Sequence, residues 1–211
     1  MAGVMMEFDP SRLIATFISF FAVVDPIGTV PVFIAFTATL NEAQKRRVAV
    51  KATIIAALVL CFFVLAGEVI LDAMQIPLAA FQISGGIILF LFAMTMIFGD
   101  SKPDEEMKIG QKAKNVAVYP LAIPSIASPG AMLAAVLLTE NDRYNVVQQA
   151  VTTGLMLSVL LITFLLMIVS SYAHRLIGNN GASVISRVMG IILAAVAMEN
   201  CLAGIRQYFQ F

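Results

Sequence analysis

The sequence is poor in charged residues and in the side chains that most often carry chemistry. Charged residues make up 12% of the 211 residues, the formal net charge is zero, and the chain has one histidine and two cysteines. A neutral chain lacks the basic surface on which nucleic-acid binding depends, so we expect no nucleic-acid partner. Cys61 and Cys201 lie inside apolar runs with no CxxC spacing, which predicts core positions and no metal or other cofactor.

These shortages also count against an intramembrane enzyme. A rhomboid-type protease needs a serine and a histidine within its spans, but His174 falls in a predicted loop. A presenilin-type protease needs two facing aspartates, and Asp100 has no partner motif. A thiol oxidoreductase needs paired cysteines. We therefore expect a protein that is not an enzyme, and an intramembrane enzyme stays an alternative.

Apolar residues are abundant instead, at 60% of the chain. A soluble domain of this length could not bury so much apolar surface, which indicates a membrane protein with the lipid bilayer as its solvent. Segments that can cross about 30 Å of hydrocarbon as α-helices number six, at about 1.5 Å of rise per residue. The sequence thus predicts an all-α membrane protein with transmembrane helices at residues 12–38, 48–70, 77–98, 117–138, 146–169 and 185–206.

The polar connections between these spans predict the orientation. The N-terminus has no basic segment and no cleavage site after the first apolar run, so we expect the first span to stay in the mature protein. If the N-terminus is outside, three basic residues are external (Arg12, Arg143 and Arg206) and ten are cytoplasmic: Lys45, Arg46, Arg47, Lys51, Lys102, Lys108, Lys112, Lys114, Arg175 and Arg187. This bias predicts that both termini face away from the cytoplasm.

The first span is interrupted by Asp25-Pro26-Ile27-Gly28. A carboxylate at this depth costs about 2.5–3.5 kcal/mol on insertion scales. Such a cost favours a discontinuous helix whose unwound turn lines a binding site near the bilayer midplane, as in secondary transporters.

The two halves of the chain contain a repeat. Residues 86–94 and 190–198 share six of nine residues at an offset of 104, and this offset brings Pro26 within one residue of Pro129, in a second break, Ser128-Pro129-Gly130-Ala131. Three spans per half is an odd number, so the halves must have opposite orientations. We therefore predict two inverted three-helix repeats, 1–100 and 117–211, each with a discontinuous first helix, joined by a cytoplasmic loop at 101–116.

Both breaks can in principle hold a small zwitterion. Proline frees carbonyls of the preceding turn, and the helix that restarts after it should present free amides at Ile27, Gly28 and Thr29, and at Gly130, Ala131 and Met132. Amides at a helix start attract a carboxylate, while loosened carbonyls and Asp25 attract an ammonium or a cation. The predicted substrate-binding residues are Asp25, Pro26, Ile27, Gly28, Thr29, Ser128, Pro129, Gly130 and Ala131.

Structural roles compete with these functional ones. Asp25 and Ser128 suit the N-cap of a restarted helix, and a cap does not exclude a ligand. The hydroxyls of Thr29, Ser84, Thr95 and Ser125 are expected to bond back to their own helices. Glu68 and Glu199 are placed near the outer ends of their spans and interpreted as interfacial, with gating or proton relay as the alternative.

With these residues in view, the chain resembles the MarC family of integral membrane proteins, which are also grouped as small neutral amino acid transporters. The resemblance rests on residues 24–31, 83–90, 120–124 with 128–130, and 187–190. It implies six transmembrane helices in a bacterial inner membrane and movement, outward, of alanine, glycine and similar amino acids. Proton or sodium coupling, a channel-like pore, an assembly factor without transport and a homo-oligomer all remain open.

Overall fold

The computed structural model describes residues 10–98, 115–141 and 143–209, and every regular element in these ranges is a helix. In chain order they are α2 (Pro10–Val24), α3 (Pro26–Thr37), α4 (Glu42–Ala73), α5 (Leu78–Phe98), the segment η1 (Ala117–Ile126), α7 (Pro129–Leu137), α8 (Val146–Ile168) and α9 (Ser170–Phe209). The prediction of an all-α protein is confirmed for these residues. Of the predicted loop 101–116, residues up to 114, with Lys102, Lys108, Lys112 and Lys114, lie outside them.

The helices have the length and composition of a multi-pass membrane protein. Five described segments can span a bilayer, and η1 with α7 makes a sixth, bent by 55°. The five are Pro10–Thr37, Glu42–Ala73, Leu78–Phe98, Val146–Ile168 and Arg187–Phe209. On α4, Leu58, Phe62 and Leu65 are exposed along one face while Ala49, Ala52 and Ala56 are buried along another. The large apolar side chains of α4 thus form the outer surface that suits contact with lipid, and the small side chains allow close packing against neighbouring helices.

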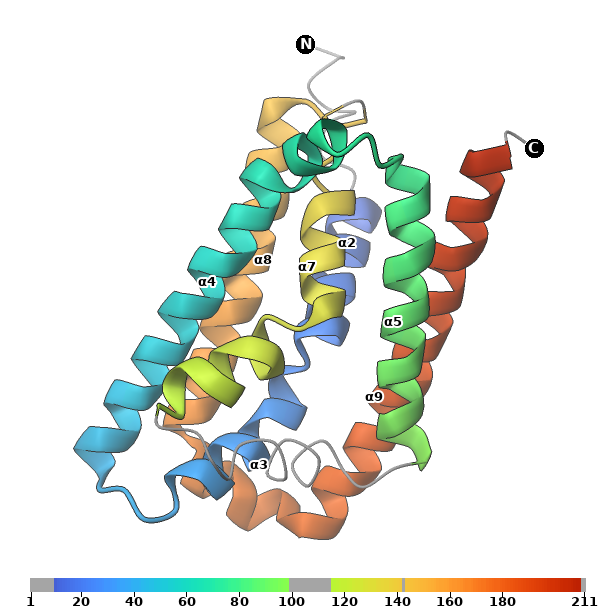
Figure 1. Ribbon diagram of the computed structural model, residues 1–211. Helices are drawn as coiled ribbons and strands as arrows, with labels where there is room; N and C mark the ends of the chain where they lie inside the picture. The colour runs from blue at the N-terminus through green and yellow to red at the C-terminus, as the bar shows by residue number, and fades with distance from the viewer. Residues whose placement is uncertain (1–9, 99–114, 142, 210–211) are drawn as a thin grey trace.

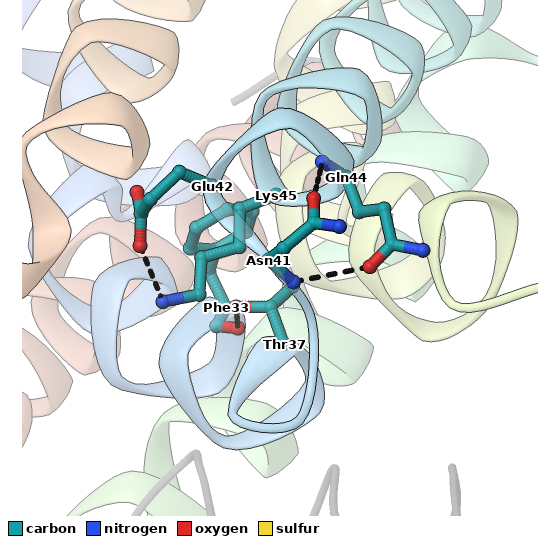
Figure 2. Close-up of polar contacts among 6 residues, drawn as sticks. All are labelled: Phe33, Thr37, Asn41, Glu42, Gln44 and Lys45. Atoms are coloured by element: carbon teal, nitrogen blue, oxygen red, sulfur yellow. Dashed lines mark hydrogen bonds and ion pairs between the residues drawn. The ribbon is translucent and has the colours of Figure 1, made fainter.

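Helix α4 begins earlier than predicted, because residues 42–47 are helical and do not form part of a loop. Asn41 is the N-cap: its side chain accepts a hydrogen bond from the Gln44 amide (2.9 Å), and the Gln44 side chain accepts one from the Asn41 amide (3.0 Å) (Figure 2). This reciprocal capping satisfies two amides that a helix start otherwise leaves unpaired. Asn145 and Gln148 form the same capping box at the start of α8.

The predicted loop at 170–183 is wrong, because α9 begins at Ser170 and is continuous to Phe209. Polar residues around Gly178-Asn179-Asn180-Gly181 suggested a connection. The segment contains no proline, however, so no residue in it prevents the backbone hydrogen bonds of a helix. The ribbon of α9 runs across the lower end of the molecule before it rises beside α5 (Figure 1).

Segment η1 is more irregular than the single predicted break at Pro129 implied. Tyr119 and Ile123 have extended backbone angles, with φ of −135° at each. Each residue directly precedes a proline, Pro120 or Pro124, and a proline ring pushes the residue before it out of the helical region. The bent pair therefore has an irregular first half, η1, and a regular second half, α7.

The helices of the first half pack against the second half in the same way as the helices of the second half pack against the first. Figure 1 shows α2 and α3 running from the upper to the lower end, while η1 and α7 run from the lower to the upper end. Helix α4 packs on η1 and α7, and α8 packs on α2 and α3. The contact of α3 with α9 has its counterpart in the contact of α7 with α5. The contact of α2 with α7 has its counterpart in the contact of η1 with α3. The main contacts are thus unchanged when α2, α3, α4 and α5 are exchanged with η1, α7, α8 and α9.

The contact between α5 and α9 is the most extensive in the molecule and depends on glycine. A Cβ atom on Gly86 would lie 2.9 Å from the carbonyl oxygen of Ala197, and one on Gly190 would lie 3.1 Å from the carbonyl oxygen of Ala93. Both Gly86 with Gly190 and Ala93 with Ala197 are 104 residues apart. The same close approach is therefore made twice, once by each half of the chain.

Candidate functional site

The joint between α2 and α3 is a single residue, Asp25. It has a left-handed backbone (φ 50°), a conformation that aspartate tolerates better than most residues. Its side-chain Oδ1 accepts a hydrogen bond from the Gly28 amide (3.0 Å), and its carbonyl accepts bonds from the amide (3.1 Å) and hydroxyl (3.0 Å) of Thr29. Asp25 is 1% exposed. The predicted break is present, and Asp25 caps the helix that restarts.

The joint between η1 and α7 is built on Ser128. Its hydroxyl accepts a hydrogen bond from the Ala131 amide (3.1 Å), which caps α7, and it donates one to the carbonyl of Val23 (2.7 Å). Val23 lies three residues before Pro26, in the last turn of α2. One buried hydroxyl therefore caps its own helix and also ties it to the other interrupted span.

The two joints meet in the interior, where the two breaks were predicted to face each other. Besides the bond from Ser128 to Val23, the hydroxyls of Thr29 and Ser125 are 3.5 Å apart, and both side chains are fully buried. The hydroxyl of Ser125 thus reaches across to α3. The crossing of the interrupted spans is thus lined by oxygen atoms from a carboxylate, three hydroxyls and backbone carbonyls.

The predicted free amides are mostly occupied, which corrects the sequence-based picture of two open helix ends. The carbonyls and side chains of Asp25 and Ser128 take up four of the six amide groups, those of Gly28, Thr29, Ala131 and Met132. The other two belong to Ile27 and Gly130. Helix caps and not open amides therefore dominate both joints.

A cavity of about 360 Å³ lies beside this crossing, between α2, α5, α7 and α9. Of the nine predicted substrate-binding residues, Gly130 is the one that lines this cavity among the residues that the structure describes. Six of the others are buried, Ile27 is half-buried and Pro129 is exposed. The lining consists of Ser19, Val23, Leu89, Gly130, Leu133, Ala134, Leu137, Leu138, Ala195, Val196, Glu199 and Asn200. Its walls are apolar, and its polar groups come from α2 and α9.

Glu199 lies nearer the middle of its helical span than the predicted bounds 185–206 implied. It was placed near the outer end of its span, but in the span Arg187–Phe209 it is twelve residues from one end and ten from the other. It is therefore close to mid-span. Neighbouring Asn200 is held from α5, because the Gln82 side chain donates to its Oδ1 (3.4 Å). The buried Gln82 was missed at the sequence level, although an amide inside an apolar span is a recognisable signal.

Glu68 lies near the end of α4, as predicted. Its carboxylate accepts a hydrogen bond from the Asn141 backbone amide (2.9 Å) in the connection between α7 and α8. In the same connection Glu140, assigned to a polar loop, is 6% exposed and pairs with Arg143 at 3.1 Å. Glu68 therefore fastens this connection to α4, while Glu140 and Arg143 form an ion pair within the connection.

The described residues contain no cluster of three or more histidine, cysteine or acidic side chains suited to a metal ion. The oxygen atoms at the crossing come mainly from hydroxyls and carbonyls. Such groups suit a proton or an alkali cation better than a transition metal.

The Ser128 hydroxyl gives a test of the crossing. We expect Ser128→Ala to lower the free energy of unfolding by about 1–3 kcal/mol, because the Val23 carbonyl loses a buried donor and the Ala131 amide loses its acceptor. SDS-titrated unfolding in mixed micelles measures this change. Ser84→Ala is the control, since that exposed hydroxyl bonds only within its own helix. Equal stability of the two variants would contradict the role of Ser128.

Comparisons with known proteins give one consistent result. The family model described as "MarC family integral membrane protein" matches residues 11–209. A "UPF0056 membrane protein" of Archaeoglobus fulgidus is 31% identical over 200 residues, covering 93% of each chain. The "UPF0056 membrane protein YvbG" of Bacillus subtilis is 32% identical over 204 residues, covering 94% of this chain and 96% of its own. No solved structure matches.

Proposed function

The chain belongs to the MarC family of integral membrane proteins, and from this premise we propose that it is a secondary transporter of small neutral amino acids such as alanine and glycine. The observation that carries the proposal is the crossing of two interrupted, oppositely directed spans beside a cavity. Binding sites of secondary transporters are typically built where discontinuous helices meet near mid-membrane. In this proposal the protein is not an enzyme, and it exports its substrate across a bacterial inner membrane.

The proposed architecture is a pair of inverted repeats. Support comes from the exchange of contacts between the halves and from the matched glycines on α5 and α9. The capping boxes add to it, because Asn41 with Gln44 and Asn145 with Gln148 are also separated by 104 residues. The two halves thus agree in sequence offset, helix starts and packing partners.

The proposed orientation places both termini outside the cytoplasm. The start of α2 and the end of α9 lie at the same end of the molecule, opposite the connection between α3 and α4 (Figure 1). Basic residues Lys45, Arg46 and Arg47 follow this connection directly. Positively charged connections face the cytoplasm.

The substrate is proposed to enter the cavity beside Gly130. A volume of about 360 Å³ is at the small end of ligand pockets, which suits an amino acid with a short side chain. The apolar walls match a methyl group, and the start of α7 adds a positive field for a carboxylate. The oxygen-lined crossing around Asp25, Thr29 and Ser125 is the proposed site of the coupling proton or sodium ion.

A channel is less consistent with the packing. Asp25 and Ser128 are each 1% exposed, and Phe20, Phe33 and Ile126 are buried in the hydrophobic core to which both interrupted spans contribute. A continuous pore through the crossing would need these groups to be exposed to water. The closed crossing favours a carrier that changes conformation during each cycle.

The proposal is tested by counterflow. Purified protein in proteoliposomes loaded with unlabelled alanine is expected to accumulate external labelled alanine transiently, and the rate should saturate with concentration. Protein-free liposomes are the control, and leucine and arginine test selectivity. A flux that rises linearly with concentration would indicate a pore, and no protein-dependent flux with alanine or glycine would contradict the proposed transport.

A further inference from the structure

A carboxylate without a partner lies at mid-span in α9. Glu199 is exposed, and within the described ranges no hydrogen bond or ion pair reaches its side chain. An acidic side chain in the hydrocarbon region is costly, and such residues almost always face the bundle interior or a cavity. Glu199 meets this expectation, because it lines the cavity between α2, α5, α7 and α9.

The surroundings of Glu199 are asymmetric in polarity. The adjacent side chain, Asn200, donates from Nδ2 to the Val196 carbonyl (3.1 Å) and accepts from Gln82 at Oδ1 (3.4 Å). Gln82 is 8% exposed, so this amide pair is fixed inside the seam of α5 and α9. Most of the remaining lining consists of leucine, valine and alanine side chains, and Ser19 is the other polar residue. Glu199 is therefore the single anionic group in a mostly apolar lining.

We propose that Glu199 binds the ammonium group of the amino acid substrate. This inference rests on the proposed transport function and adds a residue-level subsite to it. An ammonium donates up to three hydrogen bonds and carries the charge that a mid-membrane carboxylate lacks. A small neutral amino acid brings this group together with a short apolar side chain, which matches the apolar wall.

A metal cation bound at Glu199 would need more oxygen ligands than the cavity lining provides. Hard cations take six or more oxygen ligands, whereas the described cavity lining offers few oxygen-bearing side chains: Ser19, Glu199 and Asn200. One carboxylate beside apolar walls is better matched to an organic ammonium. The crossing around Asp25, by contrast, is rich in oxygen and remains the proposed coupling-ion site.

The inference is tested by alanine affinity in Glu199→Gln, which keeps the size of the side chain and removes its charge. We expect the half-saturating alanine concentration in counterflow to rise at least about tenfold, as for loss of a hydrogen bond to a charged group. Glu199→Asp should be affected less, because the charge is retained. Glu68→Gln is the matched control, since Glu68 bonds a backbone amide away from the cavity.

Substrate analogues separate ammonium binding from a structural role. Propionate and lactate lack the ammonium group, so we expect both to compete weakly with alanine for the native protein. Their affinity should be the same for Glu199→Gln, whereas that of alanine falls. The preference for alanine over both analogues should therefore be lost in the variant. Unchanged alanine affinity in Glu199→Gln, with normal counterflow by the native protein, would overturn the subsite and leave the transport proposal intact. A variant that loses sodium dependence but keeps alanine affinity would also overturn it. Absence of counterflow in the native protein would instead overturn the transport proposal.

Discussion

Asp25→Asn is expected to reduce alanine counterflow by at least about tenfold while leaving the protein as stable as the native chain. The asparagine side chain can still accept the hydrogen bond from the Gly28 amide, and asparagine also tolerates the left-handed backbone at this position. The substitution therefore removes the negative charge and little else. In the proposed mechanism that charge holds the coupling ion, and a charge-assisted contact of this kind contributes about 1.5–3 kcal/mol.

Asp25→Ala separates charge from capping. It removes both the cap, at a cost of about 1 kcal/mol, and the tolerance for a left-handed backbone, at about 1–2 kcal/mol. We therefore expect this variant to unfold at lower SDS concentration than Asp25→Asn, with transport lost in both. Native counterflow by Asp25→Asn would exclude a functional charge at the joint and reduce Asp25 to its structural role.

Gly130→Ala is expected to abolish counterflow almost completely. A Cβ atom at Gly130 would overlap Cδ1 of Leu89, and both residues line the cavity. The added methyl group must either displace the leucine into the cavity or shift the start of α7. In both cases it removes space at the point where the cavity meets the crossing, and overpacking of this kind costs about 1–3 kcal/mol.

Two further variants make this result interpretable. Gly154→Ala is the matched control, because a Cβ atom there meets nothing within 4 Å and alanine favours the helix. The double variant Gly130→Ala with Leu89→Ala restores the space, so counterflow should recover in part. Full activity of Gly130→Ala alone would show that substrate does not use the space beside Gly130.

Much of the fold was predictable because its causes are local. Long apolar runs predicted the spans, and an aspartate next to a proline predicted the interruption at Asp25. The serine before Pro129 predicted a second N-cap in the same way. Each inference needed only the neighbouring residues. The offset of 104 between the halves also predicted that the two breaks face each other, and the hydrogen bond from Ser128 to Val23 places the two joints in contact.

Two helical segments were predicted as loops because they are polar, although capping in one and the lack of proline in the other favour a helix. Polar residues at 41–47 and 170–183 suggested loops, but the first segment has a capping box that starts α4 and the second has no proline to stop α9. Glu199 was interpreted as interfacial because the predicted span 185–206 ends seven residues after it, whereas the helical span continues to Phe209. A shift of a few residues decides whether a carboxylate is interfacial or central.

The cavity itself could not be predicted from the sequence. It depends on how Leu89 and Leu133, from different helices, pack around glycines. A Cβ atom at Gly85 would lie 2.5 Å from Cδ1 of Leu133, and one at Gly130 would overlap Leu89. These are tertiary contacts between residues more than forty positions apart, and no local pattern specifies them. The number of free amides was overestimated for a local reason, because the caps expected at Asp25 and Ser128 occupy most of them.

The doubled glycine contact between α5 and α9 limits which parts of the protein can move. At Gly86 and Gly190 the space that a Cβ atom would need is already filled by the partner helix, by the Ala197 carbonyl and the Cys201 side chain in the first case and by the Ala93 carbonyl and the Met96 side chain in the second. We therefore expect α5 and α9 to move as one unit. In the proposed transport cycle, the conformational change would fall on the interrupted spans and on α4 and α8, with Asp25 and the bend at Ser128 as hinges.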